Sequence, residues 1–168
     1  LHAAIADERE MLAEVTNSAD LIIDTSRTSI YDLGDIIRDR VDARTAKSLS
    51  VLIESFGFKH GIPADADFVF DLRCLPNPYW NLQLRQLTGL DEEVIRFLDE
   101  QAVVVAMHDD ILRFLERWIP EYTRANRSFL TVAIGCTGGQ HRSVYMAEKL
   151  AASLSASHEN VATRHNEL

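Results

Sequence analysis

Apolar residues along this chain occur in two spacings that predict strands and helices in alternation. Four short apolar runs have the length and composition of strands, namely 49–56, 68–72, 129–134 and a run that starts at Val161. Three longer segments carry apolar residues at helical spacing, namely 91–98, 111–119 and 144–154. Pro120 directly follows the second of these segments and should end it. Strands that alternate with helices predict an α/β fold, with a mostly parallel sheet and flanking helices.

The first part of the chain has a pattern of its own. Helical spacing over 4–15, a short apolar run at 19–24 and a second apolar helical face over 29–41 predict helix, strand and helix. Residues 44–48 are polar and lack periodicity, so we place a domain boundary there, with 1–46 in one unit and 47–168 in the next. Because the chain starts at Leu1 and not at a Met, we expect it to be the carboxy-terminal piece of a longer protein.

Composition and charge narrow the classes of protein that fit. With 46% hydrophobic residues in 168, the chain can bury a core. Its net charge of -9 argues against a surface that coats nucleic acid uniformly. Cys74 and Cys136 lie far apart, with neither the spacing of metal ligands nor a disulfide framework. The printed sequence does not open with the pattern of a secretory signal, and no apolar run in it approaches membrane-spanning length. We therefore expect a cytoplasmic protein without a structural metal.

The segment from Gly135 to Ser143 carries most of the candidate chemistry. It joins the strand at 129–134 to the helix at 144–154, so it forms a strand-to-helix turn at the carboxyl edge of the predicted sheet. Gly138 and Gly139 let the backbone approach a ligand, and the free N–H groups at the helix start favour an anion. Arg142 can donate two hydrogen bonds to a phosphate, and the hydroxyls of Thr137 and Ser143 can add more. The turn therefore predicts a site for a phosphorylated or other anionic ligand.

Two other interpretations of the same segment stay open. Cys136, Arg142 and Ser143 have the C-x5-R-[ST] spacing of cysteine-dependent phosphatases, in which a thiolate attacks the phosphate and an acid protonates the leaving group. Asp65, Asp67 or Asp71 could supply that acid. The plainer alternative is a tight connection, with Cys136 buried at the end of its strand and Arg142 on a solvated face.

Two further loops would complete a pocket if their strands are parallel neighbours of the strand at 129–134. Their candidate residues are Lys59, His60, Asp71, Arg73, Asn77 and Tyr79. Asp71 and Asn77 suit sugar hydroxyls, while Lys59 suits phosphate; the alternative for Lys59 and Arg73 is ordinary surface charge. We expect Tyr79 and Trp80 to pack in the core or within their loop. The histidines 2, 108, 158 and 165 show no informative spacing, so we place them on the surface.

Several blocks of sequence resemble one known family. The blocks are Glu54–Ile62 (ESFGFKHGI), Asp67–Trp80 (DFVFDLRCLPNPYW), Thr88–Asp91 (TGLD), Asn126–Ser128 (NRS) and Thr131–Ser143 (TVAIGCTGGQHRS). In this order they resemble the RapZ/YvcJ family of RNase adapter proteins over about residues 49–168. In that family a P-loop domain that binds ATP or GTP precedes the carboxy-terminal domain. This chain has no G-x-x-x-x-G-K-[ST] motif, so 1–46 look like the last part of that first domain.

The resemblance also implies a function. It implies a non-catalytic domain that senses glucosamine-6-phosphate, binds a small regulatory RNA, presents it to RNase E and self-associates, thereby controlling amino-sugar synthesis. The positions that match the family's ligand site are Asp71, Cys136, Thr137, Gly138, Gly139, His141 and Arg142, with Lys59 and His60 nearby.

Two features of this chain depart from the family. Tyr79 stands where relatives can carry His, which puts one ligand contact in question. RNA-binding relatives carry a basic tail, whereas the basic residues after Leu130 are balanced by acids: Arg142, Lys149 and Arg164 against Glu148, Glu159 and Glu167. We therefore expect few contacts to RNA phosphates.

Overall fold

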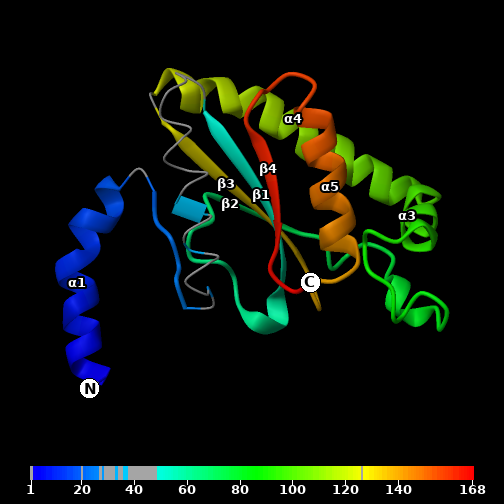
Figure 1. Cartoon of the computed structure of the whole chain (residues 1–168), viewed down its shortest axis with the longest axis horizontal. Helices are drawn as coiled ribbons and strands as arrows, with labels where there is room; N and C mark the ends of the chain where they lie inside the picture. Colours follow the sequence, from blue (N-terminus) through cyan, green and yellow to red (C-terminus); the bar gives the residue numbers. More distant parts are fainter. Residues whose placement is uncertain are drawn as a thin grey trace.

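The computed structural model describes residues 2–19, 21–26, 28, 33, 36–37, 49–125 and 127–168. Its elements, in chain order, are α1 (His2–Ser18), β1 (Ser50–Gly57), η2 (Phe58–His60), β2 (Phe68–Asp71), η3 (Pro78–Trp80), α3 (Glu92–Asp99), α4 (Ala102–Arg124), β3 (Phe129–Cys136), α5 (Arg142–Leu154) and β4 (Val161–His165) (Figure 1). No helix in the described part of the chain has the length and hydropathy that a membrane span requires.

The four strands form one parallel sheet in the order β2-β3-β1-β4. This confirms the predicted α/β fold and the four strands predicted after residue 48. The central strand β3 is buried along its whole length, as its almost unbroken apolar sequence predicts for a parallel strand covered on both faces. In the register of the sheet, Gly57 lies opposite Cys136 and Asp71 lies opposite Gly135. The carboxyl ends of β1, β2 and β3 therefore meet at one edge.

Helices α4 and α5 lie side by side along the sheet (Figure 1). Helix α5 packs on β1, β3 and β4, and its buried apolar residues include Val144, Ala147, Leu150 and Leu154. Helix α4 covers the aromatic strand β2: the ring of Phe114 makes T-shaped contacts with the rings of Phe68 and Phe70, with 5.1 Å and 5.6 Å between ring centres. Edge-to-face ring pairs of this kind add to the burial of apolar area. The packing of α5 on the sheet thus places the first residues of α5 at the edge where the strands end.

The two faces of β1 have different surroundings because successive side chains point to opposite sides. Val51 and Ile53 join the core under α5. Ser55 follows on that face, where its Oγ lies 2.9 Å from Nδ1 of His165, and Nε2 of His165 lies 3.1 Å from Glu148 in α5. His165 is therefore partly buried, and its predicted surface position is wrong.

On the opposite face of β1, Glu54 is completely buried and forms a close ion pair with Arg164 of β4. Arg164 also pairs with Asp65 at 3.2 Å, and Asn166 Nδ2 donates to Glu54 at 3.2 Å. The other carboxylate oxygen of Glu54, Oε1, has no hydrogen-bond partner among the described residues. Two acids thus share one arginine in a buried position.

Helix α4 is longer than its sequence pattern predicts. The predicted helix runs from 111 to 119 and ends at Pro120, whereas α4 runs from Ala102 to Arg124 with Pro120 inside it. The apolar face formed by Val104, Ile111, Leu115 and Ile119 stays buried across the proline, which favours continuing the helix. Pro120 has no N–H for the carbonyl of Glu116, but Glu116 is exposed, so water can solvate that carbonyl. Burial of one continuous face therefore outweighs the lost hydrogen bond.

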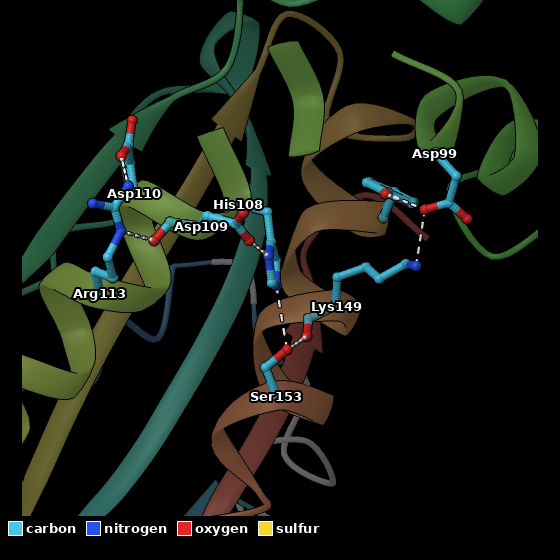
Figure 2. Close-up of polar contacts among 8 residues, drawn as sticks. Asp99, His108, Asp109, Asp110, Arg113, Lys149 and Ser153 are labelled. Carbon is cyan, nitrogen blue, oxygen red and sulfur yellow. Dashed lines mark hydrogen bonds and ion pairs between the residues drawn. The ribbon is translucent and has the colours of Figure 1, made fainter. Parts of the chain in front are cut away.

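Polar contacts fasten α3 and α4 to α5 (Figure 2). Asp99 at the end of α3 accepts a hydrogen bond from Tyr145 Oη at 2.7 Å and pairs with Lys149 at 2.9 Å. Burial acts to raise the pKa of Asp99, but these contacts outweigh it and lower the pKa. His108 of α4 lies 3.3 Å from Ser153 Oγ of α5. The side chain of His108 is only 18% exposed, so its predicted surface position is wrong as well.

The predictions for the leading segment have mixed outcomes. The helix predicted at 4–15 is confirmed by α1. The strand predicted at 19–24 is wrong for the residues that are described there, 19 and 21–24, which form neither helix nor strand. An apolar run becomes a strand only beside a partner strand, and none of these residues pairs with the described sheet. Most of the predicted helix at 29–41 and the whole of the predicted boundary at 44–48 lie outside the described residues.

Candidate functional site

Residues 136–143, termed here the ligand loop, connect β3 to α5 at the edge where the strands end. The turn after β1 lies against this loop: Lys59 N donates to the carbonyl oxygen of Thr137 at 3.3 Å. An ideal Cβ placed on Gly138 would lie 4.0 Å from Lys59 Nζ. The structure thus brings Lys59 next to the loop, as the order of parallel strands predicts.

The ligand loop and the turn after β1 are in contact through their backbones. Gly139 has a φ of +81°, and an ideal Cβ there would lie 2.7 Å from the backbone N of Gly57. In the same way, a Cβ on Gly57 would lie 2.7 Å from the carbonyl carbon of Gly138. Gly57 is a site residue that the sequence analysis missed, although it lies in the block ESFGFKHGI; a glycine directly after a buried strand was the available signal.

Arg142 is buried, with 3% of its surface exposed, at the start of α5. Its Nη1 donates to the carbonyl oxygens of Leu72 (3.3 Å), Arg73 (3.1 Å) and Leu75 (2.9 Å). Its Nη2 donates to Thr137 Oγ1 at 3.3 Å. The guanidinium therefore ties the segment after β2 to the ligand loop, whereas the sequence pattern predicts that its donors face a phosphate. Its Nε has no hydrogen-bond partner within the described residues.

Cys136 and Ser143 close the base of the ligand loop. Cys136 is 3% exposed and Ser143 is fully buried, and their Sγ and Oγ atoms lie 3.2 Å apart. The backbone N–H of Gly139 donates to the same Sγ, also at 3.2 Å. The thiol thus takes part in an internal network. Two of the acids considered for a phosphatase are engaged in contacts of their own, Asp65 with Arg164 and Asp67 with Arg127 at 2.7 Å.

Asp71 and Arg73 form a two-point ion pair at the end of β2. Arg73 Nε lies 3.0 Å from Asp71 Oδ1, and Arg73 Nη2 lies 2.7 Å from Oδ2. The hydrogen bonds from Arg73 lower the pKa of Asp71 against the opposing effect of burial, and the charge of Arg142 adds to the lowering. The guanidinium of Arg73 also lies over the ring of Phe58, 4.0 Å from its centre. Asp71 is therefore an ionised, partly exposed acceptor beside the ligand loop.

Two predicted site residues, Asn77 and Tyr79, belong to a separate loop. Asn77 Oδ1 accepts from Tyr79 N at 3.3 Å and so caps η3, while the ring of Tyr79 lies under Arg85 and beside Trp80. Among the described contacts, none joins these two residues to the ligand loop. Trp80 is 77% exposed, and its ring makes a T-shaped contact with the ring of Tyr79, so the two residues pack within their loop, which is one of the two arrangements expected for them.

The two predicted histidines of the site have different positions. His141 is 7% exposed, and its Nε2 lies 3.1 Å from the carbonyl oxygen of Leu84, so it anchors the segment before α3. Gly89 adds a second tie there, because its N donates to the carbonyl oxygen of Gln140 at 2.8 Å. His60 instead lines a groove of about 1010 Å³ that follows β4.

The geometry defines a class of protein: an α/β domain with a glycine-rich strand-to-helix loop, held by a buried arginine and flanked by a lysine, at the carboxyl edge of a parallel sheet. Small ligands bind at such edges. The sequence also matches two known family models. Residues 49–168 match the RapZ C-terminal domain, and residues 1–45 match the RapZ-like N-terminal domain. The chain belongs to the RapZ family, which confirms the resemblance drawn from its motifs.

The chain is also similar to individual curated proteins. It is 55% identical over 98% of its length to a nucleotide-binding protein of Thioalkalivibrio sulfidiphilus, of which it covers 58%. It is 53% identical over its whole length to a nucleotide-binding protein of Shewanella amazonensis, of which it covers 59%. A nucleotide-binding protein of Methylococcus capsulatus is 51% identical, and 57% of it is covered. The chain thus spans less than two thirds of the length of these relatives.

Proposed function

We propose that residues 49–168 form a non-catalytic regulatory domain that binds an amino-sugar phosphate, glucosamine-6-phosphate, at the ligand loop. The observation that carries this proposal is the position of Lys59 Nζ beside the glycines that precede α5. Backbone N–H groups and the dipole at a helix start favour an anion, and an adjacent ammonium group strengthens that preference. Loop and lysine together suit a phosphate.

The sugar part of the ligand would lie toward β2. Asp71 lies opposite Gly135 in the sheet, one residue before the ligand loop begins. Because its pKa is lowered, its carboxylate is ionised at neutral pH and can accept hydrogen bonds from sugar hydroxyls. A phosphate over the glycines and hydroxyls near Asp71 would place one hexose across the ends of β3 and β2.

Binding without catalysis is supported by the surroundings of the loop's two reactive side chains. The Cys136 thiol accepts from Gly139 N and contacts Ser143, so it is buried below the loop. The Nη1 atom of Arg142 donates to three backbone carbonyls, so this part of the guanidinium is engaged within the protein. Turnover of para-nitrophenyl phosphate that is abolished by Cys136→Ser would contradict this part of the proposal and favour a cysteine-dependent phosphatase.

For the whole protein we propose a cytoplasmic RNase adapter. In this proposal an amino-terminal P-loop domain takes ATP or GTP, and a homo-oligomer presents a small regulatory RNA to RNase E. Arg142 and Arg164 are committed to internal contacts, which leaves few cations after Leu130 for RNA phosphates. RNA binding should therefore be weak and fall steeply with salt. Absence of a gel shift even at low salt would remove RNA as a partner of this chain.

Calorimetric titration tests the ligand. We expect glucosamine-6-phosphate to bind saturably and glucosamine without phosphate to bind much more weakly. Lys59→Met should weaken phosphosugar binding by about tenfold, since a charged contact to the phosphate is lost. Lys149→Met is the matched control, because Lys149 pairs with Asp99 away from the ligand loop. No heat with any phosphosugar, or equal weakening by both variants, would contradict the proposed site.

A further inference from the structure

The carboxylate of Glu167 lies directly against the ligand loop. An ideal Cβ on Gly139 would lie 2.2 Å from Glu167 Oε2 and 2.8 Å from its Cδ. A Cβ at this position would therefore lie closer to the Glu167 carboxylate than to the backbone N of Gly57, which is at 2.7 Å. No motif in the sequence marks this residue, because it lies 28 positions after Gly139 and beyond the last strand.

The backbone next to Glu167 is firmly placed. The N–H of Asn166 donates to the carbonyl oxygen of Ser55 at 3.1 Å, which continues the pairing of β4 with β1 by one residue. The side chain of Asn166 donates to the buried Glu54 at 3.2 Å. Two contacts to β1 thus direct the residue that follows, Glu167, to the turn where β1 meets the ligand loop.

The loop consequently carries opposite charges over two consecutive glycines. Lys59 Nζ lies near Gly138, and the Glu167 carboxylate lies against Gly139. A carboxylate at this place opposes the binding of a plain anion, because like charges repel. A ligand with both a phosphate and an ammonium group meets both charges favourably. The arrangement is therefore complementary to a zwitterion.

Other carboxylates at this end of the sheet are held by arginines and lie farther from the glycines. Asp71 is bound at two points by Arg73, and Glu54 and Asp65 share Arg164. Glu167 differs from them in its position, directly against the loop that would hold the phosphate.

From this arrangement we infer that Glu167 is the residue that makes the ligand loop prefer amino-sugar phosphates over neutral sugar phosphates. The inference rests on the proposed function, since it needs a phosphosugar in the loop. The Glu167 carboxylate accepts a hydrogen bond from the ligand ammonium, while the phosphate lies on the side of Lys59. A ligand without an amine brings only its phosphate close to the Glu167 charge, and this repulsion penalises glucose-6-phosphate.

The test is calorimetric titration of wild type and Glu167→Gln with glucosamine-6-phosphate and with glucose-6-phosphate. We expect wild type to prefer glucosamine-6-phosphate, and Glu167→Gln to reduce that ratio of affinities by about tenfold or more. Most of the change should come from weaker binding of the amino sugar, with tighter binding of glucose-6-phosphate adding to it. Glu159→Gln is the control: it removes the same charge from an exposed residue before β4, at the other end of that strand.

The outcomes separate the two proposals. An unchanged ratio in Glu167→Gln, or tighter binding of both sugars by the same factor, overturns the role of Glu167 and leaves the phosphosugar site standing. Equal affinity of wild type for the two sugars likewise overturns the role of Glu167 and leaves the phosphosugar site standing. If wild type binds neither sugar, the proposed function fails, and the role of Glu167 fails with it. Circular dichroism and thermal unfolding of both variants establish that they are folded.

Discussion

At the residue scale, the ligand loop depends on one glycine with an unusual backbone conformation. We predict that Gly139→Ala lowers the free energy of unfolding by about 1–3 kcal/mol, because a side chain at positive φ is strained and its Cβ would meet Gly57 and Glu167. Gly138→Ala is the control, since the nearest atom to its Cβ is the mobile end of Lys59 at 4.0 Å. Urea unfolding of both variants measures the difference. Equal stability of the two would show that the loop tolerates a side chain at 139.

Single residues also show how far sequence reasoning reaches. Lys59 and the ligand loop could be placed together, because parallel strands end at a common edge. The direction of the Arg142 guanidinium could not, since its three carbonyl partners lie about 70 residues earlier in the chain. Likewise Ser55 and His165 are 110 residues apart. Side chains with distant partners leave no local pattern, so spacing along the chain does not predict their contacts.

At the scale of elements, Pro120 lies inside α4, where the stabilisation from burying a continuous apolar face opposes the loss of one backbone hydrogen bond. We predict that Pro120→Ala raises the free energy of unfolding by about 1 kcal/mol, because alanine restores an N–H that can donate to Glu116. The gain in the free energy of unfolding should be smaller than the usual cost of a proline inside a helix. Proline also restricts the unfolded chain, so replacing it with alanine gives back part of the gain. Pro78→Ala is a suitable control, because Pro78 lies at the start of η3, where proline is favoured. Urea unfolding that shows a loss of stability in Pro120→Ala would contradict this explanation.

Helices and strands could be predicted from the sequence where the spacing of apolar residues matches the burial of those residues in the fold. Strand β3 is almost entirely apolar, and that composition by itself predicts a buried parallel strand, whereas β1 carries the buried polar residues Glu54 and Ser55 near its end. Helix α4 was underestimated because local rules end a helix at proline, and its first turns carry the polar group His108, Asp109 and Asp110. Packing against β2 and α5 keeps the segment helical in spite of the proline and of this polar group.

At the scale of the whole molecule, the buried Glu54 should make stability depend on pH. Burial raises the pKa of Glu54 most, and the charge of Asp65 raises it further, while Arg164 opposes them. The native state therefore holds this proton more tightly than the unfolded state does. The stabilisation from Glu54 is complete below its ordinary pKa of 4.5 and is lost as pH rises through the raised pKa.

We accordingly predict that the stability of wild type relative to Glu54→Gln falls as pH increases from about 4.5 to 7. Chemical unfolding at several pH values measures this difference. Asp71, Asp91 and Asp99 have lowered pKa values and remain ionised in this window, so they do not contribute to the trend. Glu159→Gln should give a difference that is flat with pH. A difference between wild type and Glu54→Gln that is constant, or that grows with pH, would count against the raised pKa.

Sheet order was the global feature that local patterns did not determine. Strands β1 and β2 follow each other in the chain, yet β3 lies between them in the sheet. The chain passes through α3 and α4 between β2 and β3, and the periodicity of the apolar residues contains no information about which strands β3 then pairs with.

The contact between Gly57 and the ligand loop has a consequence for how this protein can change over evolutionary time. When a bulky neighbour blocks a substitution, a second mutation can shrink that neighbour. The atoms that a Cβ on Gly57 would meet belong to the backbone of Gly138 and Gly139, and no mutation makes a backbone smaller. Position 57 thus has no compensatory route: lineages that keep this loop geometry must keep the glycine, and lineages that lose it must rebuild the loop.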